Sequence, residues 1–490
     1  MRAPGKTRGR RIASSAISAR LSAHITLEAQ ADGNIFACFD GHSVALGKLS
    51  AAAVKRAQDL RIGLPLASFA QQASAVDREI DLLVRRLARR GLLEYRLGRP
   101  GEENDQVVIE PQVPDYWPRT ADLGNADMIV LSRFAYLRRR GNEMVLESPR
   151  AGALFRICDS SIATALALLS TPQKISRFRR RQDFPGIELL ALLLDCQILF
   201  KIGAAGGDGL RPAEGDDNLV LWDFHDLLFH THTTEGRQAN PLGGVYPFAG
   251  AIAPPPAVRP RWPGKKIDLR KFLAAPSDAI SPVAALLRER HSTRDFDDRH
   301  PITLAELSRF LDGAARVQAK WQSRADLGDG GPMVAYATRP YPSGGSAYAL
   351  ELYLTVANCE GLARGFYHYD ADRHALVPIG VRPQELEALL AGAEFAMGAP
   401  AAPQVLITIA ARFDRVSWKY SSIAYALILK DAGVLIQTLY LVATDMGLGG
   451  CAIGSSNIDL FSKMTGIEFH VEGPIVQFAL GRGAEPGDTG

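Results

Sequence analysis

One segment of this 490-residue chain, Arg290 to Phe296, spaces two arginines and a serine in a way that suits a phosphate group. Arg290, Ser292 and Arg294 lie two residues apart, so in an extended segment their side chains project from the same side. Two guanidinium groups and a hydroxyl are good ligands for a phosphate monoester. Arg482, which stands between two glycines near the end of the sequence, offers a third guanidinium. Each arginine taken alone is more simply explained as a solvated surface residue.

Two glycine-rich segments could place backbone amides against a planar ligand. The first runs from Pro342 to Ser346, where Gly344 and Gly345 permit backbone conformations that are closed to other residues. The second runs from Gly447 to Gly454, directly after a long apolar segment. Neither fits the Gly-x-Gly-x-x-Gly fingerprint of a dinucleotide-binding turn. An ordinary loop explains the first segment equally well, and a helix cap explains the second.

The histidines and cysteines predict no metal site. His225, His230 and His232 follow one another at spacings of five and two residues, so no two of them lie one helical turn apart. The five cysteines are scattered and contain no Cys-x-x-Cys pair, which makes a disulfide framework or a structural zinc site a poor explanation. Their pattern fits a reducing compartment, and we expect a cytoplasmic protein.

Composition and charge exclude several classes of function. Apolar residues make up 47% of the sequence and charged residues 22%, as in an ordinary globular protein, and the formal net charge is +3. This balance argues against a dedicated nucleic-acid binder, although arginine clusters at 85–90 and 177–181 keep a winged-helix DNA binder as a hypothesis of a different class. The stretch that comes closest to a membrane helix, Leu189 to Phe200, is short and carries Asp195. We expect no membrane partner.

The elements that must position these residues begin after two small modules. We expect residues 1–25 to be a disordered basic tail, residues 26–100 a winged-helix-like module, residues 101–126 a linker, and residues 127–203 a second module with the same order of elements. The first module is predicted to open with a hairpin around Asp32-Gly33-Asn34. Its last helix has an apolar stripe, and Gly91 ends that helix.

The remaining chain is predicted to be a connector and one larger domain. Residues 204–285 form a glycine- and proline-rich connector with a helical segment at 222–232, which we expect to lie on the following domain. Residues 286–485 are predicted to form an α+β domain with a central mixed sheet flanked by helices. Thr303 and Glu306 form a capping box at the start of one helix. A long apolar helix, capped by Ser421 or Ser422, should be buried, and a second subunit could cover part of it.

The combination of these motifs resembles the FMN-dependent nitroreductase fold. The segments Pro342–Tyr348, Leu350–Tyr353 and Gly365–Asp370, together with Gly361-Leu362, are similar to the SagB-type branch of that family. That branch consists of the azoline dehydrogenases of thiazole/oxazole-modified peptide biosynthesis. Residues 224–230 also resemble the branch, so the resemblance covers about 222–483. The two N-terminal modules resemble the leader-peptide-recognition domains of the same pathways.

The resemblance implies a role for Lys419 and Tyr420, which stand where that branch has its catalytic Lys-Tyr pair. Conversion of an azoline to an azole removes a proton from one ring carbon and a hydride from the next. The flavin takes the hydride, so a base must take the proton. We expect Lys419 to be that base, with a pKa lowered by partial burial, and Tyr420 to orient the substrate or relay the proton.

The resemblance also implies FMN as the cofactor and a set of residues that hold it. The expected FMN-binding residues are Arg290, His291, Ser292, Thr293 and Arg294 at the phosphate and ribityl chain, Ser343, Gly344, Gly345 and Ser346 along the flavin, Gly450, Cys451, Ala452, Ile453 and Gly454 at the ring, and Arg482 as additional charge.

The sequence departs from the family at five positions, which bear on flavin affinity or on the substrate. Ser346 stands where asparagine is common, Ile423 and Ala426 where arginines are found, and Val434 and Thr438 where histidine and asparagine are found. The implied partners are a precursor peptide, a YcaO-type cyclodehydratase complex and a second copy in a homodimer. Two alternative functions remain open: an NAD(P)H-dependent nitro- or quinone reductase, and a non-catalytic peptide-binding scaffold of the same pathway.

Overall fold

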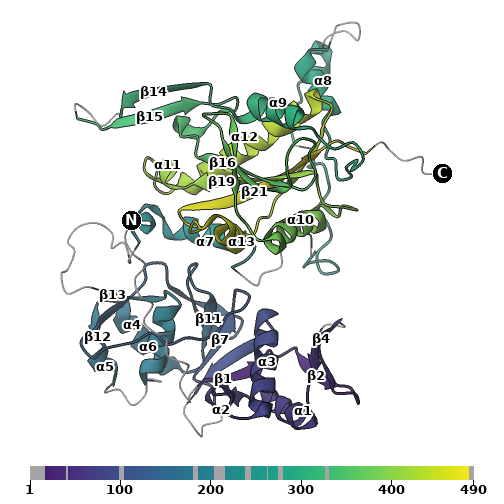
Figure 1. The fold of residues 1–490 in the computed structure, drawn as a ribbon. Coiled ribbons are helices and arrows are strands. Elements are labelled where there is room, and N and C mark those ends of the chain that lie inside the picture. Colours follow the sequence, from purple (N-terminus) through teal and green to yellow (C-terminus); the bar gives the residue numbers. More distant parts are fainter. Residues whose placement is uncertain are drawn as a thin grey trace. The chain divides into compact units, whose positions relative to one another are not determined.

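The chain forms two compact units in a computed structural model. Residues 1–232 and 236–239 make up the first unit, and residues 233–235 and 240–490 make up the second. Figure 1 shows the first unit in purple and blue and the second mainly in green and yellow. The structure describes residues 17–39, 42–98, 104–179, 186–202, 214, 216–237, 244, 246–261, 263–273, 280–325 and 330–484.

The first unit is built on a seven-stranded antiparallel sheet that both predicted modules share. Two expected boundaries are therefore wrong, because one strand lies within the predicted tail, residues 1–25, and another lies within the predicted linker, residues 101–126. The strand order is β5 (Leu64–Pro65), β1 (Ile17–Leu21), β6 (Leu93–Leu97), β7 (Val107–Pro111), β11 (Ala153–Ile157), β10 (Glu143–Glu147) and β9 (Tyr136–Arg140).

Strand β1 shows why residues 17–21 were assigned to the predicted tail. Its residues alternate, so that Ile17, Ala19 and Leu21 are buried. Arg20, on the other face, donates to the Glu94 carboxylate at 2.6 Å. A basic residue that the sequence assigns to solvent is thus paired across the sheet, while residues 1–16 of the predicted tail lie outside the described residues.

In its described residues up to Ile202, the first unit also holds two three-stranded sheets and six α-helices. The predicted hairpin is present as β2 (Thr26–Ala29) and β3 (Asn34–Phe39), and β4 (His42–Lys48) completes that sheet. The second small sheet consists of β12 (Gln173–Lys174), β8 (Met128–Leu131) and β13 (Leu199–Ile202). The helices are α1 (Ala51–Ala57), α2 (Ala67–Ala70), α3 (Ala75–Arg89), α4 (Ser160–Ala167), α5 (Ile175–Arg179) and α6 (Gly186–Asp195).

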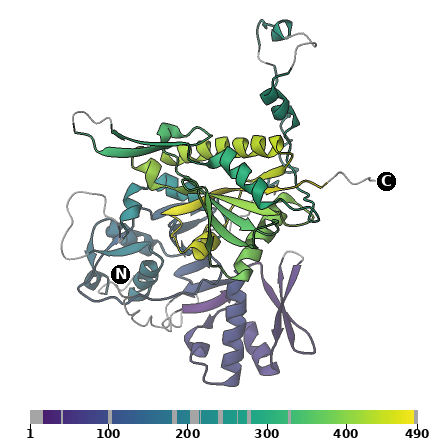
Figure 2. The same cartoon turned by 45° about the horizontal axis from the view of Figure 1, so that its top comes forward.

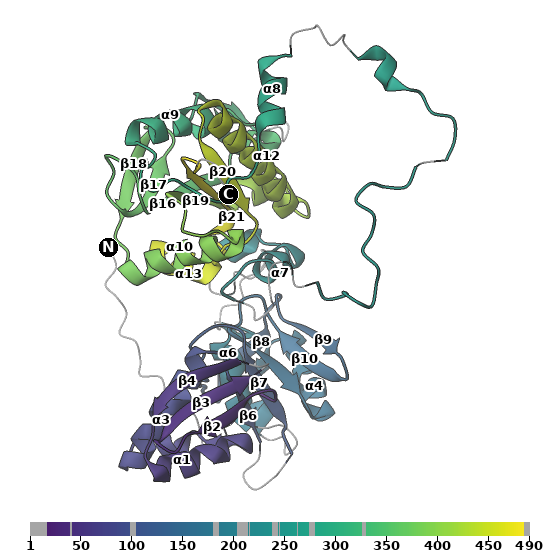
Figure 3. The same cartoon turned by 90° about the vertical axis from the view of Figure 1, so that its right-hand side faces the viewer.

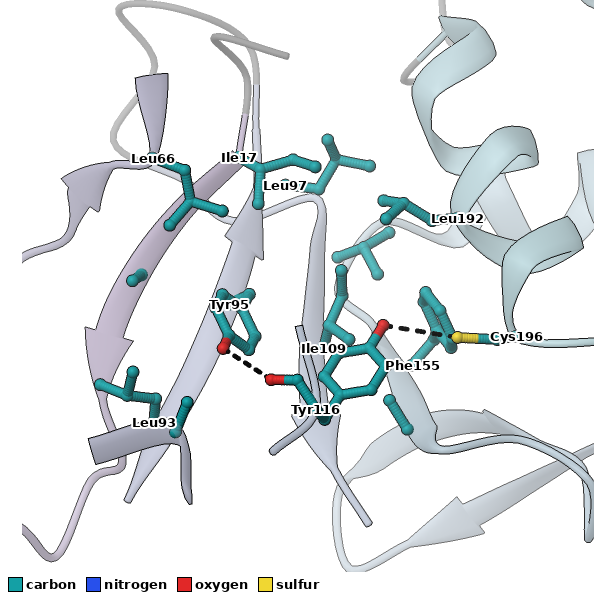
Figure 4. Close-up of a cluster of buried hydrophobic side chains, with 14 of the residues drawn as sticks. Ile17, Leu66, Leu93, Tyr95, Leu97, Ile109, Tyr116, Phe155, Leu192 and Cys196 are labelled. Carbon is teal, nitrogen blue, oxygen red and sulfur yellow. Dashed lines mark hydrogen bonds between the residues drawn. The ribbon is translucent and has the colours of Figure 1, made fainter. Parts of the chain in front are cut away.

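One hydrophobic core joins the two predicted modules (Figure 4). The Tyr95 hydroxyl, on β6, donates to the backbone carbonyl of Tyr116 at 3.0 Å. The Tyr116 hydroxyl lies 3.4 Å from the Cys196 sulfur, just after α6. Tyr116 belongs to the predicted linker, so this segment is part of the shared core.

Helix α7 (Phe224–His232) matches the predicted helical segment and belongs to the first compact unit, although we expected it on the following domain. Arg133 donates to the carbonyl of Trp222 at 2.9 Å, just before this helix. The His230 ring is buried and stacks on Trp222 with ring centres 5.9 Å apart. Among the described residues, no group of three histidine, cysteine or acidic side chains is arranged to hold a metal ion.

The second unit confirms the α+β class. Its six-stranded sheet is antiparallel in every described pairing, so the expectation of a mixed sheet is wrong. Each strand is antiparallel to the strands beside it, both where a turn connects two strands and where a helix does. The order is β18 (Ala375–Ile379), β17 (Gly365–Asp370), β16 (Leu350–Val356), β19 (Val405–Arg412), β21 (Glu472–Gly481) and β20 (Gly449–Ile453).

Helices cover both faces of this sheet (Figure 3). Helices α9 (Leu304–Ala315) and α12 (Ala424–Asp445) lie on one face, and α10 (Pro383–Met397) and α13 (Ile458–Thr465) lie on the other. The predicted capping box of Thr303 and Glu306 begins α9. A hairpin of β14 (Ala319–Arg324) and β15 (Met333–Thr338) projects from this unit (Figure 2), which also contains α8 (Pro282–Glu289) and α11 (Asp414–Ser417).

Helix α12 is long and apolar enough, by length and composition alone, to cross a membrane. The search for an uninterrupted apolar run missed it because Lys430 and Asp431 divide the run. The core helix of a globular unit meets the same criterion, and α12 buries Ile428, Leu435 and Leu439 in this unit. Its first residue follows Ile423 without a side-chain cap, so neither of the predicted serines caps it.

Candidate active site

The predicted phosphate-binding segment, Arg290 to Arg294, lies against β20 and the end of the chain. The Thr293 N–H donates to the Gly450 carbonyl at 2.8 Å, and Phe296 pairs with Gly483 in an isolated antiparallel bridge. A Cβ atom at Gly449 would lie 2.6 Å from the Thr293 side chain, so only glycine permits this approach. Three of the predicted segments therefore meet at one edge of the sheet.

Tyr440 of α12 joins two of these segments through its hydroxyl. The hydroxyl accepts the Ala452 N–H at 2.8 Å and lies 2.9 Å from the Ser292 hydroxyl. The Arg290 guanidinium lies over the Tyr440 ring, 5.0 Å from its centre, in a cation–π contact. Tyr440 is 8% exposed. Sequence analysis missed it, although a phenol within an otherwise apolar helix was an available signal.

The charges at this edge differ from one arginine to the next. In the part of the chain that the structure describes, neither Arg290 nor Arg294 has a carboxylate partner. Arg482 donates to both carboxylate oxygens of Glu306, at 2.8 and 2.9 Å, and to the His300 carbonyl at 3.1 Å. The expected phosphate ligand Arg482 is therefore already neutralised by Glu306, whereas the other two arginines remain available for an anion.

The Glu306–Arg482 pair gives a pH-dependent prediction. Desolvation raises the pKa of Glu306, but hydrogen bonds from Thr303 and Arg482 outweigh it and lower the pKa below 4.5. A lowered pKa in the folded state stabilises the fold above the unfolded value, and this stabilisation is lost as the pH falls through the folded pKa. We expect the free energy of unfolding of wild type to exceed that of E306Q by about 1 kcal/mol near pH 7. This difference should vanish in acid, where Glu306 is protonated. Chemical unfolding at both pH values measures it. Glutamine preserves the capping box, so a difference that persists in acid would contradict the prediction.

Lys419 and Tyr420 lie against the other glycine-rich segment. A Cβ atom at Gly345 would lie 2.5 Å from the Tyr420 hydroxyl oxygen and 2.8 Å from the Lys419 Nζ. Gly345 also has a φ of 61°, in the left-handed region that favours glycine. The structure thus places the predicted catalytic pair directly over the loop that was predicted to contact a flavin.

Lys419 is exposed in the single chain, and the neighbouring Trp418 is 53% exposed. The partial burial that we expected for Lys419 is therefore not present in one copy. The reason is that α11 ends two residues before Lys419 and α12 begins five residues after it, so the lysine lies on a surface turn.

The loop itself is held by Asp431, a second residue of α12 that sequence analysis missed. Asp431 accepts the Ser343 hydroxyl at 2.6 Å and the Gly344 N–H at 3.1 Å. Arg415 of α11 donates to the Ala347 carbonyl at 3.1 Å from the other side. Asp431 interrupts the apolar pattern of α12 just as Tyr440 does, and that interruption was the available signal.

Asp431 and Tyr440 project from opposite edges of the buried face of α12. An α-helix turns about 100° per residue, so side chains nine positions apart, such as Asp431 and Tyr440, point in nearly opposite directions. Asp431 contacts the loop beside Lys419, and Tyr440 contacts the segment that contains Arg290. These candidate residues therefore form two separate groups in one chain, one with the arginines and one with the Lys-Tyr pair.

Comparisons with known proteins match two parts of this chain. Residues 129–239 match the model of the cyanobactin oxidase ThcOx, and residues 287–482 match the model of the nitroreductase family. The nitroreductase-family protein MJ1384 of Methanocaldococcus jannaschii is 30% identical over 200 residues, which cover 41% of this chain and 90% of MJ1384. The chain belongs to the nitroreductase family.

Two further matches are to microcin B17 proteins of Escherichia coli. The microcin B17-processing protein McbC of Escherichia coli is 31% identical over 147 residues, which cover 29% of this nitroreductase-family chain and 53% of McbC. The chain therefore spans about half of that relative. The E. coli microcin synthetase McbBCD complex with truncated pro-MccB17 bound is 22% identical, with a TM-score of 0.36, and covers 55% of this chain and 97% of the matched chain.

These findings confirm the resemblance to the azoline-oxidising branch and support an oxidoreductase. The nitroreductase match, 287–482, falls within the domain predicted at 286–485. The oxidase match, 129–239, includes residues 224–230, which the sequence had linked to the same branch.

Several predicted flavin contacts of this nitroreductase-family chain are explained by packing. The segment predicted as a glycine-rich turn is strand β20, in which Cys451 and Ile453 point into the core. A Cβ atom at Gly450 would lie 2.3 Å from the Phe478 ring, so this glycine serves the sheet. Burial raises the pKa of the Cys451 thiol, while nearby Arg294 acts in the opposite direction. Of this segment, the backbone, Ala452 and Gly454 remain for contact with a ligand.

Proposed function

We propose that this chain is an FMN-dependent dehydrogenase that oxidises azoline rings to thiazoles or oxazoles in a ribosomally synthesised peptide. The observation that carries the proposal is the contact of Lys419 and Tyr420 with Gly345 in a nitroreductase-family domain. A base and a phenol beside a glycine-rich loop are what proton removal beside a planar hydride acceptor requires. The similarity to ThcOx and McbC supports the azoline substrate.

The residues at the sheet edge fit the phosphate of FMN. Arg290 and Arg294 are cations without a carboxylate partner among the described residues, and Ser292 is oriented by Tyr440. Such unpaired guanidiniums favour an anion beside them. When bound, FMN accepts the hydride that the azoline carbon loses.

Lys419 and Tyr420 would handle the proton. The Lys419 amine removes the proton from the ring carbon next to the one that loses the hydride, which leaves the aromatic azole. Tyr420 orients the ring or relays the proton, and the Lys419 Nζ lies 5.4 Å from the centre of its ring. Because Lys419 is exposed in one copy, the bound substrate or a second copy must shield it from water.

A homodimer would bring the two groups of residues together. We propose that one copy supplies the arginines of each active site and the other copy supplies the Lys-Tyr pair. Helix α12 separates these two groups within one chain. Its outer face is exposed and largely apolar. Ile423 is 54% exposed and Val434 38% exposed, and Gly433 between them permits close approach of another helix. Two of the departures from the family, Ile423 and Val434, thus lie on the proposed interface.

The first unit would bind the precursor peptide. An open groove of about 600 Å³ lies between β4 and α3, lined by Ala45, Leu46, Gly47, Arg86, Arg89 and Arg90. The Arg86 guanidinium is held by the Leu46 carbonyl, while Arg89 and Arg90 are exposed, and Arg89 lies 3.4 Å from Asp115 in an exposed ion pair. This basic rim suits an acidic leader segment. A YcaO-type cyclodehydratase complex would supply the azoline.

The groove yields a prediction for affinity. We expect R89E/R90E to weaken binding of a thiazoline peptide with an acidic leader about tenfold or more, because both rim charges are reversed. Oxidation of the same peptide without its leader should be unchanged. R177E, in the other arginine cluster of this unit, is the control and should bind like wild type. Equal affinity of R89E/R90E and wild type, measured by fluorescence anisotropy, would remove the groove from peptide binding.

The cysteines support a cytoplasmic location, which we also propose. All five are free thiols, and Cys196, Cys359 and Cys451 are buried. Free thiols in this number fit a reducing compartment.

Product analysis tests the proposed function. The purified protein, which should have the colour of a flavin, is incubated in air with a synthetic thiazoline peptide. Mass spectrometry should show that the peptide loses two hydrogens for each ring. Reduction of nitroarenes or quinones with NAD(P)H, without peptide oxidation, would favour the reductase instead. A colourless protein that binds the peptide would favour the scaffold.

A further inference from the structure

Asp431 is a buried carboxylate in an apolar helix, without a basic partner among the described residues. It is 7% exposed. An unpaired carboxylate in such a position is costly unless hydrogen bonds compensate it. Its hydrogen bonds come from one loop, through the Ser343 hydroxyl and the Gly344 N–H. A leucine here would continue the apolar pattern of α12, so the carboxylate must serve the loop.

The loop that Asp431 holds has an unusual backbone. Gly345, Ser346 and Tyr348 have φ values of 61°, 54° and 46°. Residues other than glycine adopt this left-handed region at an energetic cost, and they stay there only when their surroundings fix them. The Ser343 hydroxyl, which donates to Asp431, also accepts the Tyr348 N–H at 3.0 Å. Asp431 and Ser343 therefore tie both ends of the loop.

The loop conformation in turn sets the surface on which Lys419 and Tyr420 rest. Gly345 is close enough to the Lys419 Nζ and the Tyr420 hydroxyl that a shift of the loop must move both groups. Arg415 binds the Ala347 carbonyl from α11, the helix that leads into Lys419. The loop is thus clamped between Asp431 on one side and the Lys419 turn on the other.

We propose that Asp431 is a positioning residue: through Ser343 and Gly344 it fixes the left-handed loop that sets the reach of Lys419 and Tyr420. The proposal rests on the proposed function, because it assigns Asp431 a role in proton removal by Lys419. Asp431 touches neither the reacting atoms nor Lys419 directly.

The test is a double-mutant cycle of D431N and K419A, with a synthetic thiazoline peptide as substrate. Asparagine keeps the shape of the side chain, but its nitrogen cannot accept a hydrogen bond from Ser343 or Gly344. Misplacement of a catalytic group by about 1 Å can cost about a hundredfold. We expect kcat of D431N to fall by about that factor while KM changes less than about threefold. In the K419A background, D431N should cause no further loss, because the residue acts through Lys419.

Two further variants keep the test sharp. D312N removes an exposed carboxylate of α9, which pairs with Arg316, and should behave like wild type. S343A keeps the Asp431 carboxylate and removes one of its donors, so we expect a smaller loss, about tenfold. Wild-type kcat in D431N, or the same fold-loss in both the wild-type and K419A backgrounds, would overturn the proposal.

Hydrogen exchange decides the structural part independently of turnover and of flavin. In protein without flavin, the Gly344 and Tyr348 amides should exchange faster in D431N than in D312N. The amides of α12 should exchange at the same rate in both variants. Equal exchange at these amides would overturn the proposal even if the chain oxidised no azoline. Absence of azoline oxidation by wild type would instead refute the proposed function, and with it the catalytic part of this inference.

Discussion

Replacement of Lys419 by alanine is expected to reduce azoline oxidation by about a thousandfold while FMN stays bound. Loss of a general base typically costs between a hundredfold and ten-thousandfold. FMN should remain because Tyr440, and the Arg290 guanidinium over its ring, lie away from the loop that Lys419 contacts. Steady-state oxidation of a thiazoline peptide and the flavin-to-protein absorbance ratio give the two quantities.

Lys463 offers a matched control for this substitution. It is an exposed lysine of α13 in the same unit, 3.9 Å from Glu385, and K463A should oxidise the peptide like wild type. If K419A retained its activity, Lys419 would lose its assigned role. If K419A lost its flavin, the lysine would belong to cofactor binding instead.

Removal of both unpaired arginines is expected to abolish FMN binding under ordinary conditions. Each charge-assisted hydrogen bond to a phosphate contributes about 1.5–3 kcal/mol. R290A/R294A should therefore weaken FMN affinity by at least about a hundredfold, measured by titration of flavin-free protein with FMN. R316A, which removes an arginine that pairs with Asp312, should bind FMN like wild type.

Mixing two inactive variants extends this prediction to the proposed dimer. R290A/R294A and K419A are refolded or coexpressed together. If each site combines the arginines of one copy with Lys419 of the other, a mixed dimer has one intact site and regains part of the activity. If both groups of each site come from one chain, no site is intact and the mixture stays inactive. Inactivity of a verified mixed dimer would refute the shared site.

Local patterns in the sequence were enough to single out much of the candidate site. Each of these patterns spans only a few residues: Arg290, Ser292 and Arg294, then the two glycines at 344–345, then the Lys-Tyr pair. The structure brings Gly345 against Lys419 and Tyr420. The capping box that begins α9 is present for the same reason, since its hydrogen bonds join residues three apart.

Features that depend on distant partners could not be found this way. Tyr440 and Asp431 interrupt an apolar helix, and nothing nearby shows that they bind residues about 148 and 88 positions earlier. The pairing of Arg482 with Glu306 is equally remote, 176 positions apart, so a phosphate ligand looked plausible. Strand β1 was missed because Arg20 and the basic residues before the strand suggested solvent, whereas Arg20 pairs with Glu94 of the neighbouring strand.

The central claim is that an azoline peptide gives its hydride to FMN held by this chain. The most direct measurement is the flavin absorbance after a thiazoline peptide is mixed with the purified protein, without dioxygen and without NAD(P)H. We predict that the long-wavelength flavin band bleaches and that one azole forms for each flavin reduced. A band that stays unchanged with the peptide, but bleaches on addition of NAD(P)H, would contradict the account.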